Sequence, residues 1–124
     1  MFSIILVAVF GLVGGFVALT YLRCYREMRA AKSRLLAGST VLKTGHGEIE
    51  YAVEGEGTPL LVLHGAGGGY DQGLWHGKLA MGGGYKFIAV SRYGYLRTPV
   101  SSNPSINTQA ATYKACKPYV DPIL

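Results

Sequence analysis

The sequence predicts a membrane-spanning helix followed by an α/β domain, and three observations lead to this prediction. Residues 2–22 include no charged side chain and are mostly apolar. Residues 39–54 show the short alternating pattern of a β-hairpin. After them come an apolar run, a glycine-rich loop, a helical stretch and a second apolar run, which is the order of elements expected in an α/β fold.

The composition supports one small folded domain and excludes several classes of protein. Hydrophobic residues make up 49% of the 124 residues and charged residues 15%, whereas a disordered polar chain has the opposite balance. Most of the net charge of +5 falls between Arg23 and Arg34, so the basic composition does not indicate a nucleic-acid partner. Cys24 and Cys116 match no disulfide framework or zinc spacing, and we expect neither a metal nor a cofactor.

Residues 1–22 are predicted to form a transmembrane helix with the lipid bilayer as its partner. About 20 apolar residues are needed to cross the hydrocarbon core, and this segment supplies them. Tyr21 and Tyr25 lie where an aromatic interface belt is expected. The competing interpretation is a signal peptide, which has a charged beginning, a shorter apolar run and a small-residue cleavage site. The long run without a clear cleavage site favours an uncleaved, single-pass anchor.

Residues 23–38 are predicted to form a basic juxtamembrane helix. The stretch is rich in Arg, Ala, Glu and Met, which are strong helix formers, and Gly38 is a typical helix end. Five basic residues in it outweigh the single acidic residue Glu27. The positive-inside rule then predicts that the rest of the chain lies on the cytoplasmic side of the membrane.

The strands of the α/β part are predicted from periodicity and from turn residues. Residues 39–44 and 48–54 form the expected hairpin, with a turn at 45–47. After a second turn at 55–59, residues 60–63 are wholly apolar, which is typical of a parallel strand buried on both faces. Residues 85–90 form a second such strand. The acidic residues of the hairpin and turn are interpreted as solvated charges: Glu48, Glu50, Glu54 and Glu56.

A short helix is predicted between the two apolar strands. Its expected buried stripe is Leu74, Trp75 and Leu79, and glycines at 82–84 close it. A further helix is predicted over 107–116, interrupted by Lys117-Pro118.

The glycine-rich loop at residues 64–69 fits one class of ligand-binding loop better than the others. A phosphate-binding P-loop ends in Lys-Ser/Thr, but Tyr70-Asp71 follows here. A dinucleotide-binding loop has the spacing G-x-G-x-x-G, which the loop does not match. What remains is an oxyanion hole, in which backbone N–H groups stabilise negative charge on a substrate oxygen. The plainer alternative is that the glycines only make a tight turn.

Two motifs resemble the α/β-hydrolase family. The segment 61–69 (Leu-Val-Leu-His-Gly-Ala-Gly-Gly-Gly) is similar to its strand and oxyanion loop, and 91–99 is similar to the turn after its next parallel strand. That turn usually begins with Asp, where this chain has Ser91. The resemblance covers roughly residues 39–113, and the N-terminal anchor is similar to that of bacterial membrane-anchored members. Residues 39–124 are therefore expected to be the N-terminal portion of an α/β-hydrolase domain, with the first strands of an incomplete sheet.

The resemblance implies roles for the loop residues. The backbone N–H groups of Ala66 and Gly67 would be oxyanion donors. The residues implied to shape the loop are His64, Gly65, Gly68 and Gly69, and His64 is not the catalytic histidine in this pattern. Full-length relatives would hydrolyse a small-molecule ester or amide by a Ser-His-Asp mechanism.

No catalytic residue can be assigned on these 124 residues. The family's nucleophile lies in G-x-S-x-G, and no serine has these neighbours: Ser3, Ser33, Ser39, Ser91, Ser101, Ser102 or Ser105. His46 and His76 precede the place where that motif is expected. We therefore expect a truncated hydrolase whose strand 60–63 has an open edge. The alternative is a non-catalytic membrane-anchored protein with a binding role.

Overall fold

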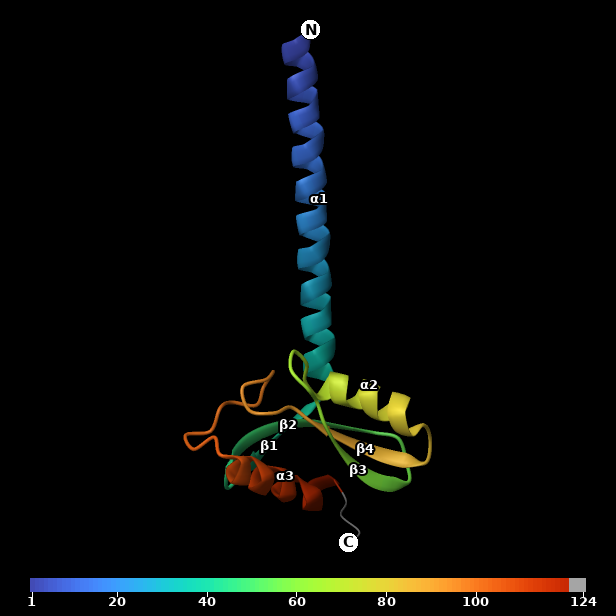
Figure 1. Ribbon diagram of the computed structural model, residues 1–124, viewed down its shortest axis with the longest axis vertical. Coiled ribbons are helices and arrows are strands. Elements are labelled where there is room, and N and C mark those ends of the chain that lie inside the picture. Colours follow the sequence, from blue (N-terminus) through green and yellow to red (C-terminus); the bar gives the residue numbers. More distant parts are fainter. Residues whose placement is uncertain (121–124) are drawn as a thin grey trace. The chain divides into compact units, whose positions relative to one another are not determined.

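The computed structural model describes residues 1–120, and its contacts divide the chain into two units, Met1–Ala37 and Gly38–Leu124 (Figure 1). Residues 121–124, which form the end of the predicted 39–124 domain and include Asp121, lie outside the described residues.

The first unit is a single helix, α1 (Phe2–Ala37), which runs without a break through the two segments predicted from the sequence. Its 36 residues correspond to about 54 Å at the usual rise, more than the roughly 30 Å of a bilayer core. None of its residues is buried. By length and composition the helix can cross a membrane, and a signal sequence would have the same properties.

The second unit is built on a four-stranded sheet in the order β1-β2-β4-β3. Strands β1 and β2 form an antiparallel hairpin, β2 pairs antiparallel with β4, and β3 pairs parallel with β4. Both the predicted hairpin and the predicted parallel pair are confirmed. The strands are β1 (Thr40–Thr44), β2 (Gly47–Glu54), β3 (Thr58–Leu63) and β4 (Tyr85–Val90).

Helix α2 (Tyr70–Met81) connects β3 to β4 and packs on one face of the sheet, but not through the predicted stripe. Trp75 and Leu79 are 61% and 70% exposed, so that prediction is wrong, and Leu74 is only partly buried. The residues that α2 buries are Tyr70, Gly73 and Gly77. Because these glycines carry no side chain, the helix backbone itself approaches the sheet, and the larger apolar residues point away from it.

Strand β3 is less buried than its sequence predicts. Leu61 and Leu63 are 45% and 49% exposed, so the prediction of burial on both faces is wrong. In the described part of the chain α2 covers the face of β3 that carries Val62, and its Gly73 and Gly77 lie so close that a Cβ atom on either would contact the Val62 side chain. Among the described strands β3 has a neighbour, β4, on one side only, which agrees with the predicted open edge.

Helix α3 (Ile106–Val120) packs against β1 and β2 on the face of the sheet opposite to α2 (Figure 1). The core on this side consists of Ile49, Val90, Tyr113 and Cys116. The helix was predicted to be interrupted at Lys117-Pro118, but it continues to Val120, so that prediction is wrong. A proline this close to a helix end removes one backbone hydrogen bond and leaves the earlier turns intact.

Candidate functional site

The loop at residues 64–69 leads from the end of β3 to the first turn of α2, and most of its glycines have a steric reason. Gly67 has a φ of +80°, a conformation that other residues rarely adopt. A Cβ atom on Gly68 would lie 2.5 Å from the Gln72 side chain, and one on Gly69 would collide with Leu96. Gly65 has open space around it, so its predicted role in shaping the loop has no comparable steric basis.

His64 holds the beginning of the loop. The residue is 2% exposed, and the backbone N–H of Arg92 donates to Nε2 over 2.9 Å. Since Nε2 accepts this hydrogen bond, the ring proton lies on Nδ1, which donates to the Gly65 carbonyl over 2.7 Å. The ring also meets that of Tyr95 edge-on, with 4.7 Å between the centroids. Both ring nitrogens are therefore engaged, and His64 fixes the backbone rather than offering a base to a substrate.

The other end of the loop is held at Tyr70, the first residue of α2. Its backbone N–H donates to the Ser91 hydroxyl over 3.2 Å. Between the two ends, Ala66 and Gly67 are exposed, and no acceptor within the described part of the chain engages their backbone N–H groups. The helix dipole of α2 adds positive potential at this end of the loop. The segment can therefore offer donors to an anionic or partly anionic oxygen.

Glu50 is buried, contrary to the prediction that the hairpin glutamates are solvated. Its side chain is 1% exposed, whereas Glu48, Glu54 and Glu56 are exposed as predicted. The reason is that Arg97 comes within 2.8 Å of the Glu50 carboxylate and two hydroxyl groups also donate to it. Burial raises the pKa of Glu50, but hydrogen bonds from Ser39, Arg97 and Ser91 together outweigh it and leave that pKa below its ordinary value.

Ser91, which stands where the resembling motif usually has Asp, belongs to the same buried cluster. It is fully buried, its hydroxyl donates to Glu50 Oε2 over 2.9 Å, and its backbone N–H donates to the Glu50 carbonyl. The following turn is tight, and Leu96 has a φ of 47°, unusual for a residue other than glycine. The sequence analysis missed the role of Glu50. A signal for it was present: Ser91 replaces the usual Asp, so the nearby Arg97 lacks that carboxylate and needs one from another part of the chain.

Comparison with solved structures places this arrangement in a known fold. An α/β-hydrolase fold protein from Nakamurella multipartita matches with a TM-score of 0.57 and 36% identity over 62% of this chain and 27% of that protein. The part of this chain that forms the sheet has the α/β-hydrolase fold. An esterase from Exiguobacterium antarcticum (TM-score 0.54, 21% identity, 66% and 31% covered) shares it. So does an N-acyl homoserine lactonase (TM-score 0.51, 26% identity, 65% and 32% covered).

The chain spans about a third or less of the length of the structures that it matches. The chain spans 27% of the first of these proteins and 32% of the lactonase. No protein-family model matches the sequence, and no curated protein does. The α/β-hydrolase fold, with the loop at 64–69 after β3, is therefore established from structure, whereas the activity is a matter for proposal.

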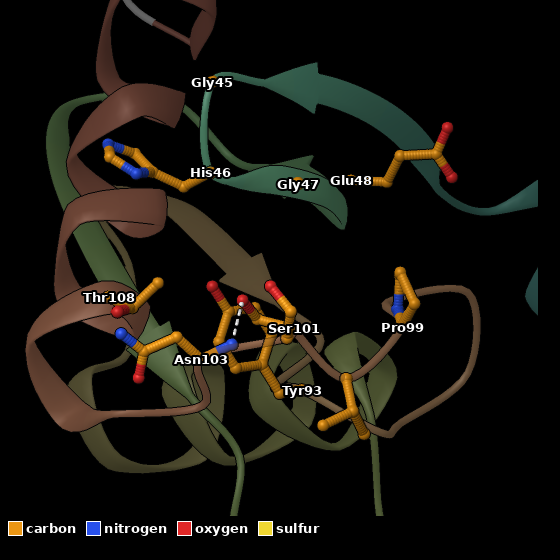
Figure 2. A pocket seen from close by; sticks show the side chains of 11 residues that line it. Gly45, His46, Gly47, Glu48, Tyr93, Pro99, Ser101, Asn103 and Thr108 are labelled. Atoms are coloured by element: carbon orange, nitrogen blue, oxygen red, sulfur yellow. Dashed lines mark hydrogen bonds between the residues drawn. The ribbon is translucent and has the colours of Figure 1, made fainter.

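A separate hollow of about 570 Å³ lies on another part of the sheet-containing unit (Figure 2). It is formed by the turn of the β1–β2 hairpin, the loop after β4 and the first turns of α3, and residues 64–69 do not line it. Its polar residues are already engaged in part: Tyr93 hydrogen-bonds Thr112 over 2.7 Å, and the Asn103 N–H donates to Ser101 over 3.3 Å. His46, predicted as a turn residue, lies exposed at its rim.

Metal-ligating side chains do not gather in the described part of the sheet-containing unit. Within the residues that the structure describes, no three His, Cys, Asp or Glu side chains are placed to hold a metal ion.

Proposed function

We propose that this chain is the N-terminal part of a membrane-anchored α/β-hydrolase that cleaves a small-molecule ester or amide, and that Ala66 and Gly67 supply backbone donors to its oxyanion hole. One observation supports this above the others. The two N–H groups lie between β3 and the N-terminus of α2, and no acceptor in the described residues occupies them.

The chemistry follows from these donors. When a nucleophile attacks an ester or amide carbonyl, the carbonyl oxygen becomes an oxyanion, and N–H groups already in position stabilise it without reorganising. His64 and Tyr70 hold the two ends of the loop, so the donors are fixed before a substrate arrives. The Ser, His and Asp of the mechanism would lie outside these 124 residues, because none of the serines present has the G-x-S-x-G pattern.

The lactonase in the comparison favours an ester-like substrate. Its name describes action on an N-acyl homoserine lactone, and a lactone is a cyclic ester. Among small-molecule substrates, oxygen esters are therefore the first class to test on this protein.

The oxyanion role is tested by removing one N–H group in a gene product that also carries the nucleophile. Ala66→Pro deletes the donor, and Ala66→Ser keeps it and serves as the control. We expect Ala66→Pro to lower kcat by about 10²- to 10³-fold with a small change in KM, as for other oxyanion donors. Equal kcat values for the two variants would show that Ala66 is not a donor.

The second candidate function, a non-catalytic binding protein, is favoured by the missing G-x-S-x-G pattern. The two candidates differ in what the 124-residue chain does alone and in what the complete gene encodes. We expect no turnover of an activated ester by the chain alone, and a G-x-S-x-G motif encoded downstream in the gene. Turnover that can be titrated with an active-site reagent would contradict the first expectation, and a gene without that motif would support the binding protein.

The membrane anchor and its orientation are also part of the proposal. The length and apolar surface of α1 and the basic residues after residue 22 support a single-pass anchor with the α/β-hydrolase unit in the cytoplasm. Reporter enzymes fused after Leu36 test this. Activity of a cytoplasmic reporter is expected, and activity only of a reporter that works outside the cytoplasm would reverse the orientation.

A further inference from the structure

We propose that Glu50 is a positioning residue of the oxyanion loop, and that its ionised carboxylate fixes Tyr70, where the loop ends, through two hydroxyl groups. The inference rests on the proposed function only in naming the segment 64–69 an oxyanion loop. The contacts themselves belong to the described structure, and they connect strand β2 with the loop through Ser39 and Ser91.

The two carboxylate oxygens of Glu50 each hold one hydroxyl group that Tyr70 contacts. Ser39 Oγ donates to Oε1 over 2.6 Å, and Ser91 Oγ donates to Oε2 over 2.9 Å. The backbone N–H of Tyr70 donates to Ser91 Oγ, and the Tyr70 side chain hydrogen-bonds Ser39. Tyr70 is 4% exposed. The first residue of α2 is therefore held at its backbone and at its side chain by groups that Glu50 orients.

The site requires an ionised carboxylate because every partner of Glu50 donates. Besides the two hydroxyls, Arg97 donates through its backbone N–H over 3.1 Å and through Nε over 2.8 Å. An ionised carboxylate accepts all four hydrogen bonds, whereas a protonated acid or an amide presents a hydrogen to at least one donor. The Ser91 hydroxyl has one proton, and when that proton is directed to Oε2 a lone pair is left for the Tyr70 N–H.

Residues 91 and 92 also hold the beginning of the loop. The Ser91 N–H donates to the Glu50 carbonyl over 2.9 Å, and the next N–H, that of Arg92, donates to His64 Nε2. The residue pair 91–92 therefore contacts both ends of the loop, and Glu50 holds that pair by its backbone and its side chain. A shift of Glu50 would be transmitted to both ends of the loop.

The plainer explanation is that Glu50 only pairs with Arg97 to stabilise the fold. The two explanations differ in which backbone amides lose protection when the carboxylate is removed. A fold-stabilising pair affects the whole sheet, whereas a positioning residue affects the amides of Tyr70 and Arg92 more than those of the β1–β2 hairpin.

Amide hydrogen exchange of the full 124-residue chain in lipid nanodiscs, read by NMR, separates these explanations. Glu50→Gln removes the charge, and Glu48→Gln on the same strand is the matched control because Glu48 is exposed and its ion pair among the described residues, with exposed Lys43, is long at 3.7 Å. We expect Glu50→Gln to speed exchange at Tyr70 and Arg92 about tenfold or more, as for the loss of a charge-assisted hydrogen bond. Exchange at Leu42 and other hairpin amides should change much less, and Glu48→Gln should change neither. Equal acceleration at all sites would overturn the proposal.

A pH titration of the unsubstituted chain covers the case in which Glu50→Gln does not fold. The amide shifts of Tyr70 and Arg97 should move together, with one midpoint below 4.5, the ordinary value for this carboxyl. If Arg97 titrates and Tyr70 does not, or if the Tyr70 amide is unprotected at neutral pH, the proposal is wrong. These readouts need no turnover, so failure of the proposed hydrolase activity would leave them unchanged and be recognised separately.

Discussion

Helix α2 approaches the sheet through Gly73 and Gly77, and this contact leads to a quantitative prediction for Gly77→Ala. A methyl group at this position would lie 2.9 Å from Cδ1 of Phe87 and 3.2 Å from the side chain of Val62. Phe87 is 3% exposed and lies within β4, so its ring has little room to move. Gly73→Ala is the matched substitution, because its methyl group would lie 3.2 Å from the small Cβ of Ala89.

The expected free-energy change is the sum of two opposing effects. Replacing Gly by Ala inside a helix stabilises it by about 0.8–1 kcal/mol. Overpacking a well-packed contact costs about 1–3 kcal/mol. For Gly77→Ala the contact with the Phe87 ring is the tightest, so we expect a net destabilisation of about 1–2 kcal/mol. For Gly73→Ala the two effects nearly cancel, and we expect a change within about 0.5 kcal/mol of zero.

Pulse proteolysis in urea, applied to the full chain in detergent, measures the free energy of unfolding of the sheet-containing unit. A loss of 1–2 kcal/mol lowers the urea midpoint by about 1 M for a domain of this size. His76→Ala compared with His76→Gly calibrates the helix preference, because His76 is exposed on the same helix. If Gly77→Ala lowers the free energy of unfolding no more than Gly73→Ala does, the predicted contact with Phe87 is absent and the reasoning fails.

Three further predictions concern ionisation, burial and the sheet edge. The pKa of Glu50 is lowered in the folded state, so its contribution to stability is present above about pH 4.5 and is lost as the pH falls toward the folded-state pKa. Urea midpoints measured at decreasing pH should therefore fall less steeply for Glu50→Gln than for the unsubstituted chain, and parallel curves would contradict this. Burial raises the pKa of the Cys116 thiol to about 11, and the residue is 1% exposed. In a Cys24→Ser chain, mass spectrometry should therefore detect alkylation of Cys116 by iodoacetamide only after unfolding. Rapid alkylation of the folded chain would show that α3 does not pack on the sheet. Leu61→Lys on the edge strand β3 should reduce the self-association measured by light scattering without lowering the urea midpoint, because Leu61 is 45% exposed. Unchanged self-association would show that another surface of the chain is responsible for it.

The strands were predictable because their signals are local. The hairpin, both strands of the parallel pair and their order in the chain follow from alternation, apolar runs and turn residues, and β4 matches its predicted range of 85–90. The position of the loop at 64–69, between β3 and α2, was predictable because its glycines follow a strand directly. These features depend on neighbours in the sequence.

The errors came from contacts between residues far apart in the sequence. The face of α2 was assigned from Leu74, Trp75 and Leu79, because apolar periodicity cannot indicate that glycines make the contact with the sheet. Glu50 was assigned to solvent because its partners Ser91 and Arg97 lie 41 and 47 residues away. Burial of an acidic residue depends on such partners, and a pattern of alternation on one strand does not contain them.

The contact between Gly73 and the sheet has a mechanical consequence for the loop. Gly73 lies between Tyr70 and Gly77, so a tilt of α2 about this contact would move those two residues in opposite directions. With a rise of about 1.5 Å per residue, they lie about 4.5 Å and 6 Å along the helix from Gly73, and lifting the helix by about 0.5 Å at Gly77 would push Tyr70 about 0.4 Å the other way. Such a displacement would alter the hydrogen bond between the Tyr70 N–H and the Ser91 hydroxyl. A substitution at Gly77 would then act on the end of the loop at Tyr70 from two helical turns away, without touching the loop itself.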